Sequence, residues 1–444
     1  MADPKSLEKL KKLIELCLKK ENSQESETGE YCAEDFVGAD LTYADLSLAD
    51  LDGINLRGAN LIGAYLLCSN LRKTNLTGSN LSRANLSGAI LWFAEVEDAN
   101  LSAGDIRGGS LNNANLSRSN LSRSNLWRCE LKNAKLIEVN FSSACLSNAN
   151  LAGADLTGAN LAGADLDNAN LTGANLTGAN LSGANLRNAD LSDSNLSDAT
   201  LSNVNLNFAK LNRVNFTGAN LSNVNCTDAN LSDVNFNNAN LKGAKLNGAN
   251  LRGARMTSKT EIDTKWKLAW QIVNNGAYNQ DLSGSDLSHA NLKGANLGRA
   301  NLTGGNLEGV NLRYANLSEA ILADADLRDA NLRDINAIGA DFSNTNLSNA
   351  NLSNTLLFNA NLMGALLKHT KLIKTQLSDA ELSKTVLFKT NLLDANMKNA
   401  RLLEAELNEV NLIDTELENA LFGKNIGIDD RMKLDLIDRG AIFE

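Results

Sequence analysis

The chain is poor in residues that interrupt β-structure and in residues that carry acid–base chemistry. Among 444 residues there is one proline, Pro4, and there are two histidines, His289 and His369. A proline removes a ladder hydrogen bond, so the sequence after Pro4 allows uninterrupted β-ladders. No nucleophile or carboxylate motif stands beside either histidine, so we expect neither catalysis nor a metal site there. The sequence predicts a protein that is not an enzyme.

Other signatures of function are missing as well. The six cysteines have no CxxC spacing. Cys129 occupies an alanine position and Cys226 replaces a central leucine, so both are interpreted as small core residues, which favours a reducing compartment. Neither a GxGxxG turn after a strand, nor a P-loop, nor a calcium-binding nonapeptide occurs, so we expect no cofactor. No apolar run approaches the roughly 18 residues of a membrane span, and the N-terminus has no secretory pattern. We therefore expect a cytoplasmic protein.

A five-residue phrase fills most of the chain. Between residues 149 and 188, leucine stands at every fifth position from Leu151 to Leu186, alanine stands two residues before each leucine, and Asn or Asp stands between them. Residues two apart point to the same side of an extended backbone, so leucine and alanine share an inner face. An odd period must turn a corner before the next pair, and the Gly and Asn that follow suit that corner. The pattern predicts a solenoid.

The phrase A(N/D)LXX resembles that of the pentapeptide-repeat family. The resemblance covers residues 36–256 and 282–422. It implies an all-β solenoid, a right-handed quadrilateral β-helix in which four repeats make one square turn and residues 20 apart stack on neighbouring turns.

Charged residues at a spacing of 20 support this coil. Opposite charges lie 20 residues apart in Asp98, Arg118 and Glu138, in Lys374 and Asp394, in Lys384 and Glu404, in Lys389 and Glu409, and in Glu381 and Arg401. Arg313 with Arg333 and Asp394 with Asp414 are like-charged exceptions. Such surface pairs contribute little individually.

The period divides the chain into five segments. Residues 1–30 predict an amphipathic helix and a linker, 31–256 a first β-helix, 257–280 a helical cap, 281–422 a second β-helix, and 423–444 a C-terminal helical cap. The N-terminal helix could be a lid over the first coil or a docking element.

Both caps are predicted from a change to helical spacing. In residues 260–276, Ile262, Trp266, Trp270 and Val273 lie on one face, and Thr260 with Asp263 resembles a capping box. We expect this helix to cover the open core of the first array. The second helix, predicted over residues 429–439, would cover the end of the second array with Met432 and Leu436.

Two surfaces are candidates for binding a protein partner. Ile373, Leu393 and Ile413 follow central leucines at 20-residue spacing and should form an exposed apolar row, with Val386 and Phe388 on the neighbouring face. The row could form a homodimer or partner interface, or the C-terminal tail could cover it. In the first array Trp92 and Phe93 are candidates, although Arg72, Lys73 and, for Trp127, Arg107 could cover these rings by cation–π stacking.

Charge bears on one property of the family. Some pentapeptide-repeat proteins, those that protect DNA gyrase from quinolones, resemble a DNA duplex in shape and negative charge. Residues 36–256 hold 17 basic and 18 acidic residues, and residues 281–422 hold 12 and 18. The second array therefore has a net charge of −6, whereas duplex DNA of about 35 Å carries roughly 20 negative charges. We therefore expect a non-catalytic protein-interaction scaffold that does not bind nucleic acid directly, with a DNA-mimic binder of gyrase or another DNA-binding protein as the alternative.

Overall fold

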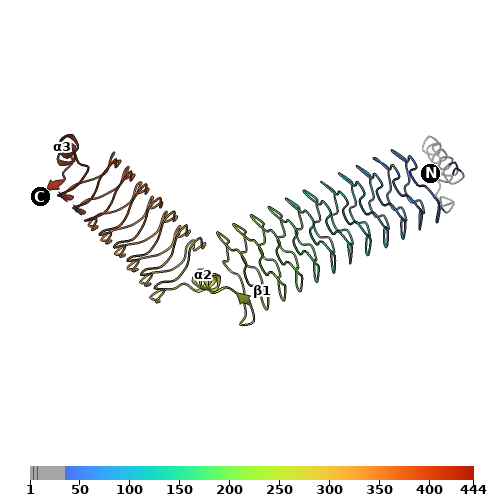
Figure 1. The fold of residues 1–444 in the computed structure, drawn as a ribbon, viewed down its shortest axis with the longest axis horizontal. Helices are drawn as coiled ribbons and strands as arrows, with labels where there is room; N and C mark the ends of the chain where they lie inside the picture. Colours follow the sequence, from blue (N-terminus) through green and yellow to red (C-terminus); the bar gives the residue numbers. More distant parts are fainter. Residues whose placement is uncertain (1–3, 5–7, 9–35) are drawn as a thin grey trace, which may run out of the picture. The chain divides into compact units, whose positions relative to one another are not determined.

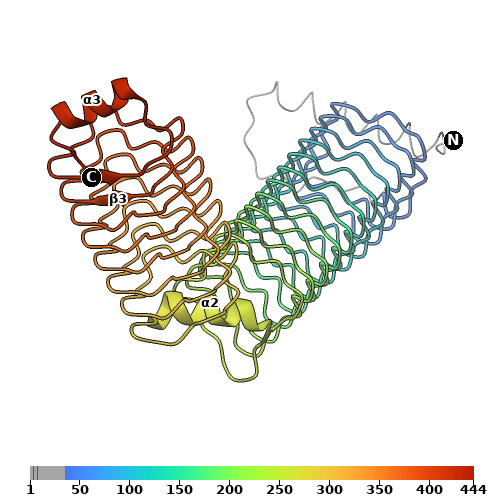
Figure 2. The ribbon, with the colours of Figure 1, turned by 60° about the vertical axis from the view of Figure 1, so that its left-hand side comes forward.

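The protein is built from repeated coils, which Figures 1 and 2 show in a computed structural model. The structure describes Pro4, Glu8 and residues 36–444. The predicted N-terminal helix and linker at 1–30 therefore lie almost wholly outside the described residues, as do Cys17 and Cys32.

Each coil takes 20 residues. Parallel bridges join residues one coil apart, as in Asn100 with Asn120, from Asp40 in the first array to Ile426 in the second. The backbone N–H of Leu151 donates to the carbonyl of Asn170 at 2.7 Å, and the N–H of Gly153 donates to that of Thr172 at 3.0 Å. Four pentapeptides therefore close one turn, and the predicted stacking at a spacing of 20 is confirmed.

The core is a column of leucine and small residues. The central leucines and the alanines two residues before them are buried throughout both arrays, and Phe216 stacks on Phe236 with ring centroids 5.4 Å apart. Buried threonines that replace alanine keep their hydroxyls satisfied. Thr375 Oγ1, for example, donates to the carbonyl of Leu352 at 2.9 Å. Among the described residues Ser194, in the same position, is an exception, because its buried hydroxyl has no hydrogen-bond partner.

The corner residue of each repeat has a left-handed backbone. This residue, two positions after the central one, has φ near +57° even where it is large, as in Phe93 (57°) and Tyr314 (62°). An ordinary side chain in this conformation costs about 1–2 kcal/mol, which glycine avoids and Asn or Asp reduces. The preference for Gly, Asn and Asp at this position follows from the corner.

The first period break contains a short strand and a helix. Strand β1 (Asn240–Leu241) pairs in parallel with β2 (Glu261–Ile262), and helix α2 spans Thr264–Asn275. Ile262 therefore belongs to a strand and not to the helix. The predicted capping box is also wrong: Asp263 is the N-cap residue but its side chain makes no capping bond, and Thr260 Oγ1 donates instead to the carbonyl of Phe236 at 2.8 Å.

The chain ends in a small parallel sheet with one helix. Strands β3 (Arg401–Leu403), β4 (Leu421–Gly423) and β5 (Ile442–Phe443) lie side by side, and helix α3 (Asp430–Asp438) connects the last two. Asp429 caps α3 by accepting a hydrogen bond from the N–H of Met432 at 2.7 Å.

The described residues form two compact units. Residues up to Lys245 together with Gly253–Ile262 make one unit, and Leu246–Arg252 together with Asp263–Glu444 make the other. Helix α2 thus groups with the second array, although the sequence suggests that it covers the first. Neither helix of the described part is long and apolar enough to cross a membrane. The five predicted segments remain a prediction.

Candidate partner-binding surface

The predicted apolar row is a continuous feature of the second array. Ile373, Leu393 and Ile413 occupy the same position in three successive coils, since the N–H of Lys374 donates to the carbonyl of Leu393 and that of Asp394 to the carbonyl of Ile413. The exposure differs from the expectation, because Ile373 and Leu393 are half-buried whereas Ile413 is 60% exposed. The row is therefore most accessible at its C-terminal end.

A groove lies at that end of the row. Its volume is about 840 Å³, and its walls come from residues 409–414 of the last coil and from helix α3. Val410, Leu412 and Ile413 supply the apolar part on one side, and Met432 and Leu436 supply it on the other. The C-terminal end of the row and helix α3 thus line one groove of mixed polar and apolar character.

Arg439 fixes α3 beside the groove. Its guanidinium donates to the carbonyl of Leu412 at 2.8 Å and to that of Thr415, and it also donates to Asp435 at 3.1 Å. Basic side chains at a helix C-terminus often bind free carbonyls, and Arg439 directly precedes Gly440, so this position was a signal that sequence reasoning missed. Leu436 is fully buried, and Met432 is half-buried.

The rim of the groove is acidic. Glu409 forms an ion pair with Lys389 at 3.5 Å, and Asp435 pairs with Arg439. Asp414, the third acid of the rim, has no ion pair among the described residues. The groove therefore combines an apolar floor with one uncompensated carboxylate.

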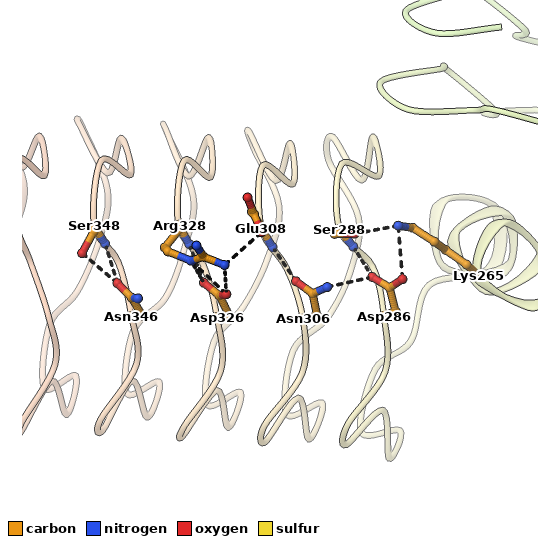
Figure 3. Close-up of polar contacts among 9 residues, drawn as sticks. All are labelled: Lys265, Asp286, Ser288, Asn306, Glu308, Asp326, Arg328, Asn346 and Ser348. Atoms are coloured by element: carbon orange, nitrogen blue, oxygen red, sulfur yellow. Dashed lines mark hydrogen bonds and ion pairs between the residues drawn. The ribbon is translucent and has the colours of Figure 1, made fainter. Parts of the chain in front are cut away.

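The neighbouring face of the second array begins as a polar ladder, shown in Figure 3. Lys265 of α2 donates to Ser288 Oγ at 2.6 Å and pairs with Asp286 at 3.3 Å, and Asn306 Nδ2 donates to Asp286 Oδ1. Arg328 continues the ladder by pairing with Glu308 and with Asp326. These contacts tie α2 to the second array, in agreement with the compact units.

The same face becomes apolar farther along the chain, at Val386 and Phe388. Both are half-buried, and Phe388 is partly shielded by its neighbours. The ring of His369 meets Phe388 edge-on at 5.5 Å, and Lys389 Nζ lies 5.0 Å from the centroid of that ring. This patch is therefore less open than the groove.

The aromatic candidates of the first array differ from each other. Trp92 is half-buried, since the Arg72 guanidinium lies 4.3 Å from its ring centroid and its indole N–H donates to Ser110 Oγ. Phe93 is 56% exposed. Cation–π stacking by a neighbouring arginine thus covers Trp92, whereas Phe93 is exposed to solvent.

The predicted stacking of Arg107 on Trp127 is wrong. The guanidinium of Arg128 lies over the Trp127 ring, 4.3 Å from its centroid. Arg107 instead donates hydrogen bonds to Asp105 from both its guanidinium and its backbone N–H. The hydrogen bond with Arg107 lowers the pKa of Asp105, against a smaller opposing effect of burial. A two-point bond to a carboxylate outweighs a ring contact at an exposed site.

Three of the predicted ion pairs occur. Arg118 pairs with Asp98 at 2.9 Å, Arg401 with Glu381 at 3.2 Å, and Lys389 with Glu409. Within residues 36–444, no ion pair joins Arg118 to Glu138, Lys374 to Asp394 or Lys384 to Glu404, and Arg118 pairs with Glu97 instead of Glu138. Arg313, predicted to face Arg333, pairs with Asp334 at 3.0 Å, which relieves the like-charged contact.

The described residues offer no cluster of three or more His, Cys, Asp or Glu side chains that could hold a metal ion. Cys129 and Cys226 are buried and unpaired with another cysteine. Burial raises the pKa of each thiol to about 12. Both residues are part of the core, as predicted.

A family model for pentapeptide repeats matches most of the chain. The matched segments together cover residues 35–102, 114–257, 281–318, 320–359 and 360–423. The chain belongs to the pentapeptide-repeat family. Its fold is accordingly the right-handed quadrilateral β-helix of that family, and pentapeptide-repeat proteins are in general structural or interaction proteins rather than enzymes. No curated protein matches the chain.

Solved pentapeptide-repeat structures are similar to parts of the chain. HetL, a protein involved in heterocyst differentiation regulation from the cyanobacterium Nostoc sp. strain PCC 7120, is 34% identical over 44% of this chain and 91% of its own, with a TM-score of 0.23. Rfr23 from the cyanobacterium Cyanothece 51142 is 40% identical over 22% of this chain and 64% of its own, with a TM-score of 0.14. QnrB1, a plasmid-mediated fluoroquinolone resistance protein, is 16% identical over 46% and 92%, with a TM-score of 0.21. With such TM-scores these superpositions carry no functional argument.

Proposed function

We propose that this pentapeptide-repeat protein is a non-catalytic scaffold that binds a protein partner in the groove between residues 409–414 and helix α3. The observation that carries the proposal is the groove itself, which joins the exposed Ile413 to Met432 and Leu436 in a volume of about 840 Å³. Concave apolar sites with a few polar groups are typical binding sites. The free thiol of the exposed Cys68 suits the cytoplasm.

The groove favours a peptide segment with apolar side chains and one basic residue. The apolar floor would accept side chains of the leucine or methionine type, since burying such a side chain is worth about 1.5–3 kcal/mol. Asp414 at the rim has no cation of its own among the described residues. A Lys or Arg of the partner would therefore meet an uncompensated carboxylate, which adds specificity more than affinity.

Apolar side chains outside the groove are also exposed in α3 and in β5. Leu434 is 69% exposed and Ile437 is 46% exposed, and Ile442 of β5 is 48% exposed. Exposed large apolar side chains mark a contact site where they form one contiguous patch. A second copy of this chain is therefore one occupant that the experiment below must distinguish from a separate partner.

Peptide selection tests the proposal. We expect the wild-type protein to enrich peptides that carry apolar residues next to Lys or Arg, and we expect Ile413→Asp to lose them because it places a charge on the apolar floor. Met363→Asp is the matched control, since Met363 occupies the equivalent position on another face of the second array and is 43% exposed. Asp414→Lys should reverse the charge preference of the selected peptides.

Several results would contradict it. If wild type and Ile413→Asp select the same peptides, or if Met363→Asp loses them equally, the groove is not the binding site. If light scattering shows that wild type is a dimer and Ile413→Asp a monomer, with no peptide enriched by either, the surface is a homodimer interface instead. The DNA-mimic alternative predicts that the protein inhibits supercoiling by gyrase. Reversing the charge of the acidic side chains that imitate DNA should abolish that inhibition.

A further inference from the structure

The first array contains a basic region in an acidic protein. The whole chain has a net charge of −10, yet residues 53–135 contain ten Lys and Arg against five Asp and Glu, a net charge of +5. These residues form the blue-to-cyan coils of Figure 1. One face of these coils has a groove of about 510 Å³ that is independent of the partner site proposed above.

Two arginines stand at the groove two coils apart. Arg83 and Arg123 occupy the same corner position, with Ala103 in the coil between them, because the N–H of Arg83 donates to the carbonyl of Ser102 and the N–H of Ala103 to that of Ser122. Both arginines and Ala103 are exposed. With about 4.8 Å between coils, the two corners are about 10 Å apart, and the small Ala103 leaves the space between them open.

Neither arginine has an ion-pair partner among the described residues. The acids of the intervening coil already have partners, since Glu97 and Asp98 pair with Arg118, Asp105 pairs with Arg107, and Glu95 accepts a hydrogen bond from Asn115. The hydrogen bonds that Arg118 and Arg107 donate lower the pKa of Asp98 and of Asp105, respectively. Arg83 and Arg123 therefore carry charge that the protein itself leaves uncompensated.

The rest of the groove also offers donors rather than acceptors. Asn100 Oδ1 accepts from the N–H of Ser102 at 3.2 Å and from Asn120 Nδ2 at 3.4 Å, which uses both of its lone pairs. The hydroxyls of Ser102 and Ser122 line the groove, have no hydrogen-bond partner among the described residues, and can donate. Guanidinium and hydroxyl donors repeated along a line match an anion with several charged groups in a row.

We propose that this groove binds a linear oligophosphate that lies along the coil stack, with its ends at Arg83 and Arg123 and its middle over Ala103. A phosphate chain presents acceptor oxygens at every link, so it can take hydrogen bonds from the serine hydroxyls as well as from both arginines. The two corners are about 10 Å apart, so an anion whose charges are spread along the stack can meet both guanidiniums without either side chain bending over Ala103. The geometry therefore favours a chain over one ion.

Calorimetric titration with inorganic tripolyphosphate tests the proposal. We expect wild type to bind tripolyphosphate at least about tenfold more tightly than orthophosphate, and the double variant Arg83→Gln with Arg123→Gln to lose about tenfold or more of that affinity. The matched control is Arg57→Gln with Arg187→Gln, which removes the same charge from exposed positions of the same array outside the groove.

A second variant fills the groove without removing an arginine. Ala103→Glu should abolish tripolyphosphate binding, since the new carboxylate lies between both guanidiniums. It should fold normally, because Glu138 occupies the equivalent corner with φ 56°, close to the 55° of Ala103. Circular dichroism checks the fold of each variant.

The proposal is wrong if the control double variant weakens binding as much as the groove variant, since the effect is then net charge alone. It is also wrong if orthophosphate binds as tightly as tripolyphosphate, or if Ala103→Glu binds like wild type. None of these results would affect the partner groove of the second array, so the two proposals fail separately.

Discussion

Truncating Trp266 should destabilise helix α2 far more than truncating Trp270. Trp266 is only 6% exposed, whereas Trp270 is half-buried, and Ala269 and Ile272 complete the buried side of the helix. Large core truncations of this kind cost about 3–5 kcal/mol. The Lys265 ammonium, 5.0 Å from the Trp266 ring centroid, adds about 0.5–1 kcal/mol that the variant also loses.

For Trp270→Ala we expect a smaller loss of about 1–2 kcal/mol, because less apolar area leaves water when the helix forms. Solenoids unfold locally as well as globally, so the two variants are best compared by hydrogen exchange of the α2 amides together with urea unfolding. Trp127→Ala is the control, since that side chain is 39% exposed and lies far from α2 in the sequence.

The reasoning fails if Trp270→Ala accelerates exchange of the α2 amides as much as Trp266→Ala does. It also fails if Trp266→Ala changes nothing, because α2 would then be held by its polar contacts, such as the hydrogen bond from Asn274 to the carbonyl of Leu251 at 3.0 Å.

Three further predictions concern the coils. Replacing Phe93, at φ 57°, by Asn should raise the free energy of unfolding by about 0.5–1 kcal/mol, and a lower urea midpoint would contradict the corner argument. With iodoacetamide at pH 8, mass spectrometry should show the exposed Cys68 modified in the native protein and Cys129 modified only after unfolding, because burial raises the pKa of Cys129 to about 12. The side-chain hydrogen bond from Arg328 lowers the pKa of Asp326, so this carboxylate stabilises the fold above its unfolded pKa of about 3.9 and loses that contribution as the pH falls through its folded pKa. Asp326→Asn should therefore lose less stability than wild type between pH 5 and pH 2, and equal losses in chemical unfolding would contradict the assignment.

The coil could be predicted from sequence because one period controls both burial and pairing. A leucine at every fifth residue fixes which side chains face inward, and the 20-residue turn then fixes which surface residues are neighbours, as for Asp98 and Arg118. Helix α3 could also be predicted from the sequence, since Asp429, Met432 and Leu436 have helical spacing. In each case the signal lies within a few residues or within one coil.

Choices between competing partners could not be predicted. By sequence position Arg107 could contact either Asp105 or Trp127. The geometry of the corner places its guanidinium on the Asp105 carboxylate. Thr260 could cap a helix or close a turn, and it bonds to Phe236 because β2 pairs with β1. The groove could not be predicted either, because the sequence does not indicate which coil α3 packs against after its connecting loop.

The 20-residue coil also sets how the length of this protein can change. Because each coil contributes the same rise of about 4.8 Å and returns the chain to the same face, a duplication of 20 residues would move everything after it along the stack without rotating it. A duplication of five residues would instead turn all later side chains onto the next face, so that Ile413 would no longer continue the row of Ile373 and Leu393. Whole coils are thus the unit in which a chain of this kind can be lengthened while its surface sites stay aligned.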